Sequence, residues 1–183
     1  MDEINKEGDD LILVNLEEER YYDKLINLLR NITKDHKKVC YLCLNRPYND
    51  VLIDIQKNSL DVNNFFFIDT LASYYKKQEN LNNCIFIDSP RNIEEIKKTI
   101  KIVVNKEGCE GLFVDTISSL LLYNEGSFII RLVHDLKSGI ITESKNLKRS
   151  FLISLKRDDI PKEDYTNLLK DLSMFSDEVI QYY

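Results

Sequence analysis

Glycine and proline are scarce in this chain of 183 residues, which contains five glycines and three prolines. Few breaking residues predict regular secondary structure joined by short loops. Long apolar runs are missing as well, because no stretch approaches the roughly 20 residues that a membrane-spanning helix needs. These shortages exclude a transmembrane protein from our expectations, and the length predicts one domain of ordinary size.

Positive charge is also in short supply, because 25 lysines and arginines face 31 aspartates and glutamates, and the net charge is −6. Binding to nucleic acid needs a basic surface, and an anionic membrane repels an acidic one. We therefore expect neither nucleic acid nor a membrane as a partner. Residues 1–9 are polar and acidic, unlike a signal peptide, and we interpret them as a flexible acidic lead-in to one domain over residues 10–183.

Residues for nucleophilic or acid–base catalysis are few, since the chain has two histidines and no G-x-S-x-G motif. His134 precedes Asp135 in a predicted helix, where adjacent side chains do not face each other. The four cysteines lie mostly in apolar runs, which indicates reduced core residues of a cytoplasmic protein. Cys40 and Cys43 form a C-x-x-C within a predicted strand, so they point to opposite faces and cannot share a metal. We predict no metal site.

Short apolar runs alternate with segments of helical periodicity along the chain. Strands are predicted at residues 10–16, 38–45, 65–69, 84–88, 112–115, 151–155 and 177–183. Helices are predicted at residues 17–35, from Pro47 through 55, from 93 to about 107, at 126–141 and around 165–175. This alternation predicts an α/β fold, in which a mainly parallel twisted sheet carries helices on both faces.

Two predicted helices have recognisable first turns. Glu17, Glu18 and Glu19 would open the helix at 17–35, where the helix dipole favours negative charge. Asn92 is expected to cap the helix that follows it.

Three predicted strands end alike, in an aspartate: Phe67-Ile68-Asp69, Phe86-Ile87-Asp88 and Phe113-Val114-Asp115. Parallel strands that end in this way would place acids along one polar edge, where α/β proteins bind their ligands.

Hydroxyl residues Thr116 and Ser118 follow Asp115. Two interpretations of Asp115 stay open. It is either a residual metal or nucleotide ligand, or the cap of the turn after its strand, with Thr116 and Ser118 as local partners.

Three segments resemble the RecA-like P-loop ATPases, and most of all their archaeal KaiC-like branch. Residues 112–121 (LFVDTISSLL) are similar to the Walker B strand and its serine-rich turn, residues 64–69 (NFFFID) to the family's F-x-I-D strand, and residues 174–180 (MFSDEVI) to the opening of its late strand. The resemblance covers residues 10–183. It implies a single RecA-like (KaiC-like) domain in which Asp115, Thr116 and Ser118 are residual Walker-B-like residues.

The chain departs from this family at its catalytic positions. A P-loop needs G-x-x-x-x-G-K-[ST], whose glycines, lysine and hydroxyl hold phosphate and magnesium. Residues 16–24 (LEEERYYDK) contain no glycine and no Lys-Ser/Thr pair, so the Walker A motif is absent. Asn45-Arg46 stands where KaiC-like ATPases carry a catalytic acidic pair, and neither side chain can act as a general base.

Lys156-Arg157 follows the sixth predicted strand, near a place where basic residues of oligomeric relatives can reach a neighbour's phosphate. A plainer interpretation of Lys156-Arg157 is a solvated strand end, or a salt bridge to Asp158 and Asp159.

The sequence thus predicts a degenerate, non-catalytic RecA/KaiC-like domain that acts as a regulatory or protein-interaction module, through self-association or an active relative. We expect no ATP hydrolysis, no catalytic residue and no cofactor, and the missing loop weighs against nucleotide binding. The alternative is a nucleotide-binding ATPase-like protein with an altered phosphate site near Asp115. A recombinase-like DNA-binding role is disfavoured by the acidic balance. Both the helix at 126–141 and the edge strand near Tyr182-Tyr183 are open as interfaces.

Overall fold

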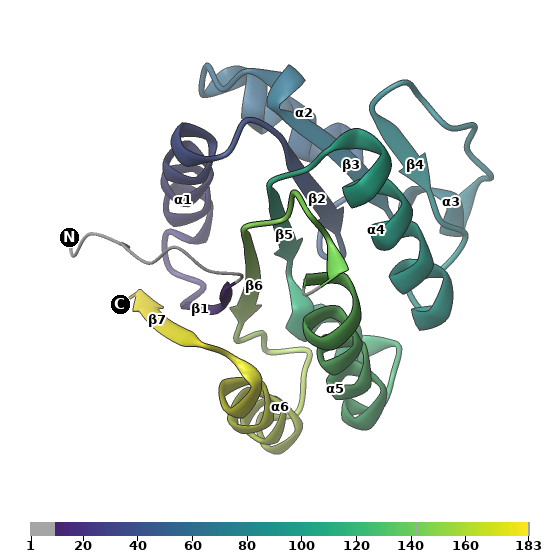
Figure 1. Cartoon of the computed structure of the whole chain (residues 1–183). Coiled ribbons are helices and arrows are strands. Elements are labelled where there is room, and N and C mark those ends of the chain that lie inside the picture. Colours follow the sequence, from purple (N-terminus) through teal and green to yellow (C-terminus); the bar gives the residue numbers. More distant parts are fainter. Residues whose placement is uncertain (1–9, 142, 183) are drawn as a thin grey trace.

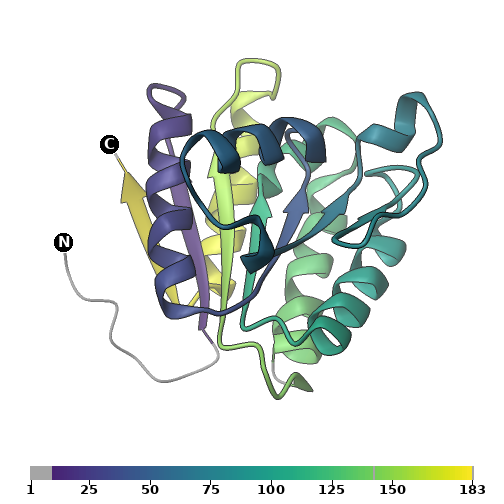
Figure 2. The ribbon, with the colours of Figure 1, turned by 90° about the horizontal axis from the view of Figure 1, so that it is seen from above.

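The computed structural model describes residues 10–141 and 143–182 (Figure 1). The predicted lead-in at 1–9 and Tyr183 lie outside the described residues. One seven-stranded sheet runs through the molecule in the order β4-β3-β2-β5-β6-β1-β7, and its strands all point the same way (Figure 2). The strands are β1 (Asp10–Leu16), β2 (Val39–Cys43), β3 (Phe65–Asp69), β4 (Cys84–Phe86), β5 (Gly111–Asp115), β6 (Arg149–Leu155) and β7 (Glu178–Tyr182).

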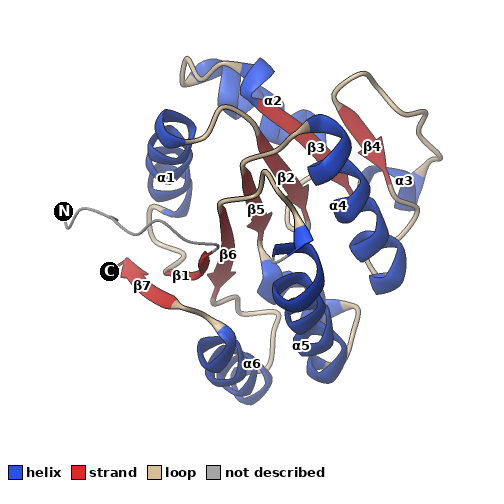
Figure 3. Cartoon of the chain, viewed as in Figure 1, coloured by secondary structure: helices blue, strands red, loops and turns tan. Residues whose placement is uncertain are grey.

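Helices cover both faces of this sheet (Figure 3). They are α1 (Tyr21–Asp35), α2 (Tyr48–Lys57), α3 (Ala72–Tyr75), α4 (Ile93–Glu107), α5 (Gly126–Asp135) and α6 (Lys162–Phe175). Helices α1 and α2 lie on one face, and α4, α5 and α6 lie on the other (Figure 1). The mainly parallel α/β architecture predicted from the sequence is confirmed. Among the described residues, no helix is long and apolar enough to cross a membrane.

The five inner strands, β1, β2, β3, β5 and β6, are apolar almost throughout because each one buries both of its faces. In β1, Leu11 and Leu13 pack toward α4, α5 and α6, whereas Ile12 and Val14 pack toward α1 and α2. Successive residues of a strand point to opposite faces, so a strand between two helical layers needs consecutive apolar residues.

The four cysteines are free and buried, as predicted. Cys40 faces the layer of α4 and α5, and Cys43 faces the layer of α1 and α2. The C-x-x-C pair is therefore split between the two cores. Within the described part of the chain, no group of His, Cys, Asp or Glu is placed to hold a metal ion.

Helix α1 begins later than predicted. Glu17, Glu18 and Glu19 lie in the exposed connection that precedes the helix, and the acid of its first turn is Asp23. The turn closes through Arg20, whose left-handed backbone (φ 58°) is not helical. Only from Tyr21 onward do apolar side chains return to the sheet at helical spacing, so the prediction that the three glutamates form the first turn was wrong.

The later helices follow the predictions with one change of geometry. Asn92 caps α4, because its Oδ1 accepts the Glu95 N–H at 3.1 Å. The predicted helix at 126–141 is α-helical to Asp135 and continues as a π-helix over Leu136–Ile141.

Candidate functional site

Two strand-end aspartates lie at the carboxyl edge of the sheet, one on each side of β2. Asp69 ends β3 and Asp115 ends β5, and both are in register with Cys43 of the intervening strand β2. Both aspartates are fully buried. Asp88 follows the end of β4 and is exposed. The sheet therefore buries two of the three acids at this edge and leaves the third in solvent.

The carboxylate of Asp115 is enclosed by two tyrosine hydroxyls. Tyr21, the first residue of α1, donates to Oδ1, and Tyr41, in the middle of β2, donates to Oδ2. Each carboxylate oxygen therefore has its own hydroxyl donor inside the core. The peptide bond that joins Asp115 to Thr116 is cis.

Burial sets the protonation behaviour of this group. Loss of solvent raises the pKa of Asp115, and the hydrogen bonds from Tyr21 and Tyr41 and the charge of Arg46 oppose that rise. Burial, followed by the neighbouring Asp115 carboxylate, raises the pKa of both tyrosines well above its usual range. Both hydroxyls therefore keep their protons at neutral pH and stay hydrogen-bond donors.

An aromatic layer fixes the position of Tyr41. Its ring centroid lies 5.1 Å from that of Phe113 and 5.7 Å from that of Phe67. A tyrosine buried in an apolar strand normally finds a partner for its hydroxyl. That rule, applied to Tyr41 in its apolar strand, was the sequence signal that could have pointed to a buried acceptor such as Asp115.

Asp69 is held in a different way, by backbone amides. Its Oδ2 accepts the Tyr48 N–H at 2.6 Å, and its Oδ1 accepts the N–H groups of Leu71 and Ala72 at 2.7 and 3.0 Å. The carboxylate thus ties the start of α2 to the turn after β3.

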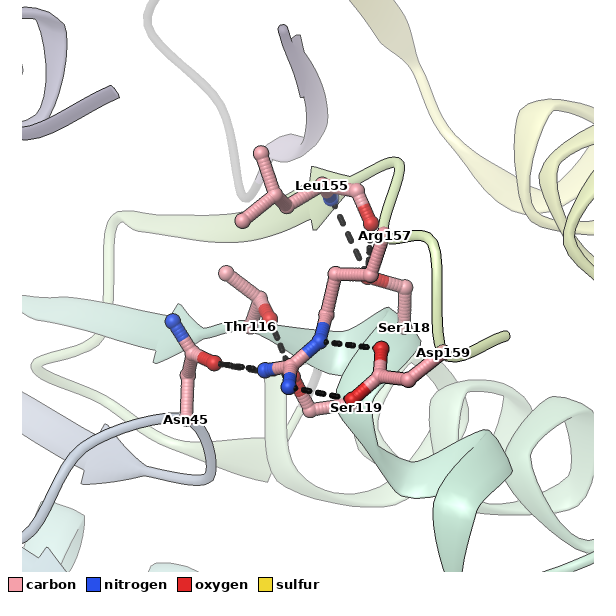
Figure 4. Close-up of polar contacts among 7 residues, drawn as sticks. All are labelled: Asn45, Thr116, Ser118, Ser119, Leu155, Arg157 and Asp159. Atoms are coloured by element: carbon pink, nitrogen blue, oxygen red, sulfur yellow. Dashed lines mark hydrogen bonds and ion pairs between the residues drawn. The ribbon is translucent and has the colours of Figure 1, made fainter. Parts of the chain in front are cut away.

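Thr116 and Ser118 form their hydrogen bonds with Ser119 and Leu155 (Figure 4). Thr116 Oγ1 lies 2.7 Å from Ser119 Oγ. The Ser118 hydroxyl donates to the Leu155 carbonyl at 2.9 Å and accepts the Leu155 N–H at 3.0 Å, which joins this turn to the end of β6. The interpretation that Thr116 and Ser118 serve as local partners of Asp115 was therefore wrong, because its partners come from α1 and β2.

Arg157 closes the same edge of the sheet (Figure 4). Its guanidinium binds Asp159 through two contacts, at 2.8 and 2.6 Å, and donates a third hydrogen bond to Asn45 Oδ1. The Ser119 hydroxyl also points at this Asn45 oxygen, at 3.4 Å. The predicted salt bridge between Arg157 and Asp159 is confirmed, and Lys156 is exposed.

Arg46 contacts residues of α1 and α2. It forms an ion pair with Asp54 of α2, and its guanidinium lies 4.8 Å from the ring centroid of Tyr22. Burial alone would lower the pKa of Arg46, but Tyr41 and Asp115 raise it. Arg46 is therefore a fixed positive charge near Asp115.

The connection between β1 and α1 is short and acidic. Glu17, Glu18 and Glu19 are exposed, and the Tyr21 N–H at the start of the helix donates to the Glu18 carbonyl at 3.2 Å. This connection therefore presents three carboxylates to solvent at the carboxyl end of β1, and such charges repel an anion placed among them.

The sheet order and the helical layers define a RecA-like α/β fold of the KaiC-like kind. No protein-family model matches the chain, and no curated protein is similar to it in sequence. Among solved structures, the KaiC-like protein PH0186 from the hyperthermophilic archaeon Pyrococcus horikoshii OT3 matches with a TM-score of 0.61 and 12% identity, over 95% of this chain and 71% of that one. The uncharacterised protein PH0321 from Pyrococcus horikoshii, solved in complex with an unknown peptide, matches with a TM-score of 0.70 and 17% identity, over 97% and 78% of the two chains. Structural similarity at 12% and 17% sequence identity shows a shared fold alone.

Proposed function

We propose that this chain is a non-catalytic RecA/KaiC-like domain that acts as a regulatory or protein-interaction module and does not hydrolyse ATP. The observation that carries the proposal is the enclosure of Asp115. A carboxylate that holds magnesium needs an oxygen open to the ion. Both oxygens of Asp115 accept tyrosine hydroxyls, and the residue is fully buried.

The connection between β1 and α1, where a P-loop would bind phosphate, supports the same proposal. A triphosphate needs free backbone N–H groups and a cation at the start of α1. This chain has Glu17, Glu18 and Glu19 there, the adjacent cation Arg20 pairs with Asp23, and the Tyr21 N–H is already bonded. Arg157 is neutralised by Asp159 of its own chain, so it has no unpaired charge to offer a phosphate.

The interaction role draws support from one structural neighbour. PH0321 was solved with a peptide bound, and the match covers 97% of this chain and 78% of PH0321. A RecA-like scaffold that binds polypeptide without nucleotide chemistry is the role we infer here.

Phosphate release from ATP in the presence of magnesium tests the absence of hydrolysis. The wild-type chain is expected to release no phosphate above a protein-free blank. The Asp115→Asn variant is the matched control, because turnover that persists in it does not depend on the Asp115 carboxylate. Turnover in the wild type that disappears in Asp115→Asn would overturn the proposal and establish the alternative, an altered nucleotide site near Asp115.

A further inference from the structure

The two outer strands of the sheet, β4 and β7, differ in the hydrogen bonding of their outer edges. The free edge of β4 is closed by its own chain. Leu81 exchanges backbone hydrogen bonds with Cys84 at 2.8 and 3.4 Å, and the Asn80 side chain accepts the Phe86 N–H at 2.9 Å. A capped edge of this kind cannot add another strand.

Strand β7 has β1 as its one neighbour in the sheet order. Its outward backbone groups follow from two observations on β1. The Asp10 N–H donates to the carbonyl of Lys148, which directly precedes β6, at 3.2 Å. The backbone N–H and C=O groups of even-numbered residues of β1 therefore face β6, and those of odd-numbered residues face β7. Ile12 is in register with Glu178.

This register makes the backbone groups of Glu178 and Ile180 face β1, because a residue of a parallel strand directs its N–H and its C=O to the same side. The N–H and C=O groups of Val179 and Gln181 therefore face outward. Within residues 10–141 and 143–182, no other segment hydrogen-bonds to this outer edge of β7.

We propose that β7 pairs with β7 of a second copy of this chain, antiparallel, about a two-fold axis at Ile180. In that register Val179 exchanges both backbone hydrogen bonds with the partner's Gln181, and Gln181 does the same with the partner's Val179. The outward N–H and C=O groups of each copy thereby pair with those of the other copy, as an isologous two-fold interface requires. The two sheets become one continuous sheet.

The side chains of β7 suit a second copy. Glu178 is the only acid of the strand and faces the partner's Tyr182 position, so no like charges lie opposite each other. Ile180 packs against the apolar layer of α1 and α2, and the two-fold axis places the partner's Ile180 directly beside it. The apolar layer therefore continues across the junction. The strand has no proline and no lysine, the residues that commonly protect an edge.

The inference rests on the proposed interaction role and names a second copy of this chain as the partner. Its test is the Val179→Pro variant, because proline at this position removes an outward N–H and leaves the hydrogen bonds to β1 in place. Sedimentation velocity over a rising concentration series is expected to show a dimer for the wild type and for Val179→Thr, and a monomer for Val179→Pro. A wild type that stays monomeric, or a Val179→Pro chain as dimeric as the wild type, would overturn the proposal.

A crosslinking variant keeps the test decisive if Val179→Pro fails to fold. Residues directly opposite at the axis have Cβ atoms about 5 Å apart, so Ile180→Cys is expected to form an intermolecular disulfide on mild oxidation. The matched Val179→Cys variant should crosslink much less, since that residue lies off the axis. Equal crosslinking of the two would contradict this register. ATP turnover lost in Asp115→Asn would overturn the proposed function alone, whereas a monomer that releases no phosphate would overturn the dimer alone.

Discussion

Asp69 and Asp115 occupy equivalent places on either side of β2, yet different kinds of donor hold them. Asp69 accepts three backbone N–H groups, from Tyr48, Leu71 and Ala72. Asp115 accepts two side-chain hydroxyls, from Tyr21 and Tyr41. A backbone N–H can only donate, whereas a hydroxyl can donate or accept. The donors to Asp69 therefore cannot reverse their role, whereas the two hydroxyls around Asp115 can.

The largest effect is expected at Asp69. Asparagine there turns an amide NH2 toward a backbone N–H, which leaves buried donors without an acceptor. Since a hydrogen bond to a charged group contributes about 1.5–3 kcal/mol and an unsatisfied buried group costs about 1–3 kcal/mol, Asp69→Asn should lower the free energy of unfolding by about 4 kcal/mol. Urea denaturation followed by circular dichroism measures it. A loss no greater than that of Asp115→Asn would remove the distinction between the two acids.

Removal of one hydroxyl from Asp115 should have the next largest effect. Tyr41→Phe leaves one oxygen of a buried carboxylate unpaired, and we expect a loss of about 2 kcal/mol. Tyr21→Phe is the matched variant for the other oxygen, with a similar loss. Because residues in one hydrogen-bonded network couple, the double variant should depart from the sum of the single losses. Strict additivity would show that the two hydroxyls act independently.

Asp115→Asn should be milder than either tyrosine variant. The asparagine oxygen can accept from one hydroxyl, and its NH2 can donate to the other once that hydroxyl rotates. We expect a loss of about 1 kcal/mol at neutral pH, measured by the same urea titrations. A loss as large as that of Asp69→Asn would mean that the hydroxyls cannot reverse.

The pH dependence of this variant sharpens the comparison further. The pKa of Asp115 is raised in the folded state by burial. A raised carboxyl pKa gives stability that is complete below the unfolded value, about 4, and is lost as the pH rises through the folded value. The stability advantage of the wild type over Asp115→Asn should therefore shrink as the pH increases from about 4. An advantage that grows with pH would show that the folded pKa is lowered.

The smallest effect is expected at the Arg157–Asp159 ion pair after β6. Arg157 pairs with Asp159, whose side chain is half exposed, and a pair of this kind contributes about 0–1 kcal/mol. Arg157→Ala should change the free energy of unfolding by less than about 1 kcal/mol, and the change should diminish in high salt. A larger loss that is insensitive to salt would place Arg157 in the folding core.

The fold could be predicted from the sequence because its inner strands are buried on both faces and its helices on one. Consecutive apolar residues and helical periodicity were therefore both visible, as in Phe65–Asp69 and Ile93–Glu107. The start of α1 could not be predicted. Glu17, Glu18 and Glu19 suit a first helical turn, but the chain must first leave the sheet edge before Tyr21 can face the core.

The hydrogen-bond partners of Asp115 could not be predicted from the sequence for a related reason. Tyr21 and Asp115 are 94 positions apart, and Tyr41 and Asp115 are 74 apart. Such contacts depend on which strands become neighbours. Without an established strand order, the hydroxyls at positions 116 and 118 were the nearest candidates, and they bond elsewhere.

A thermal-shift titration with ATP, ADP and GTP, each with magnesium, tests the central claim most directly. A ligand at about 100 times its dissociation constant stabilises a one-site protein by about 2.7 kcal/mol, which raises Tm by about 5–10 °C in a domain of this size. We predict no shift with any of the three nucleotides at millimolar concentration, in the wild type or in Asp115→Asn. A clear shift in the wild type that Asp115→Asn abolishes would contradict the account, since it would mean that the enclosed carboxylate opens to bind a nucleotide.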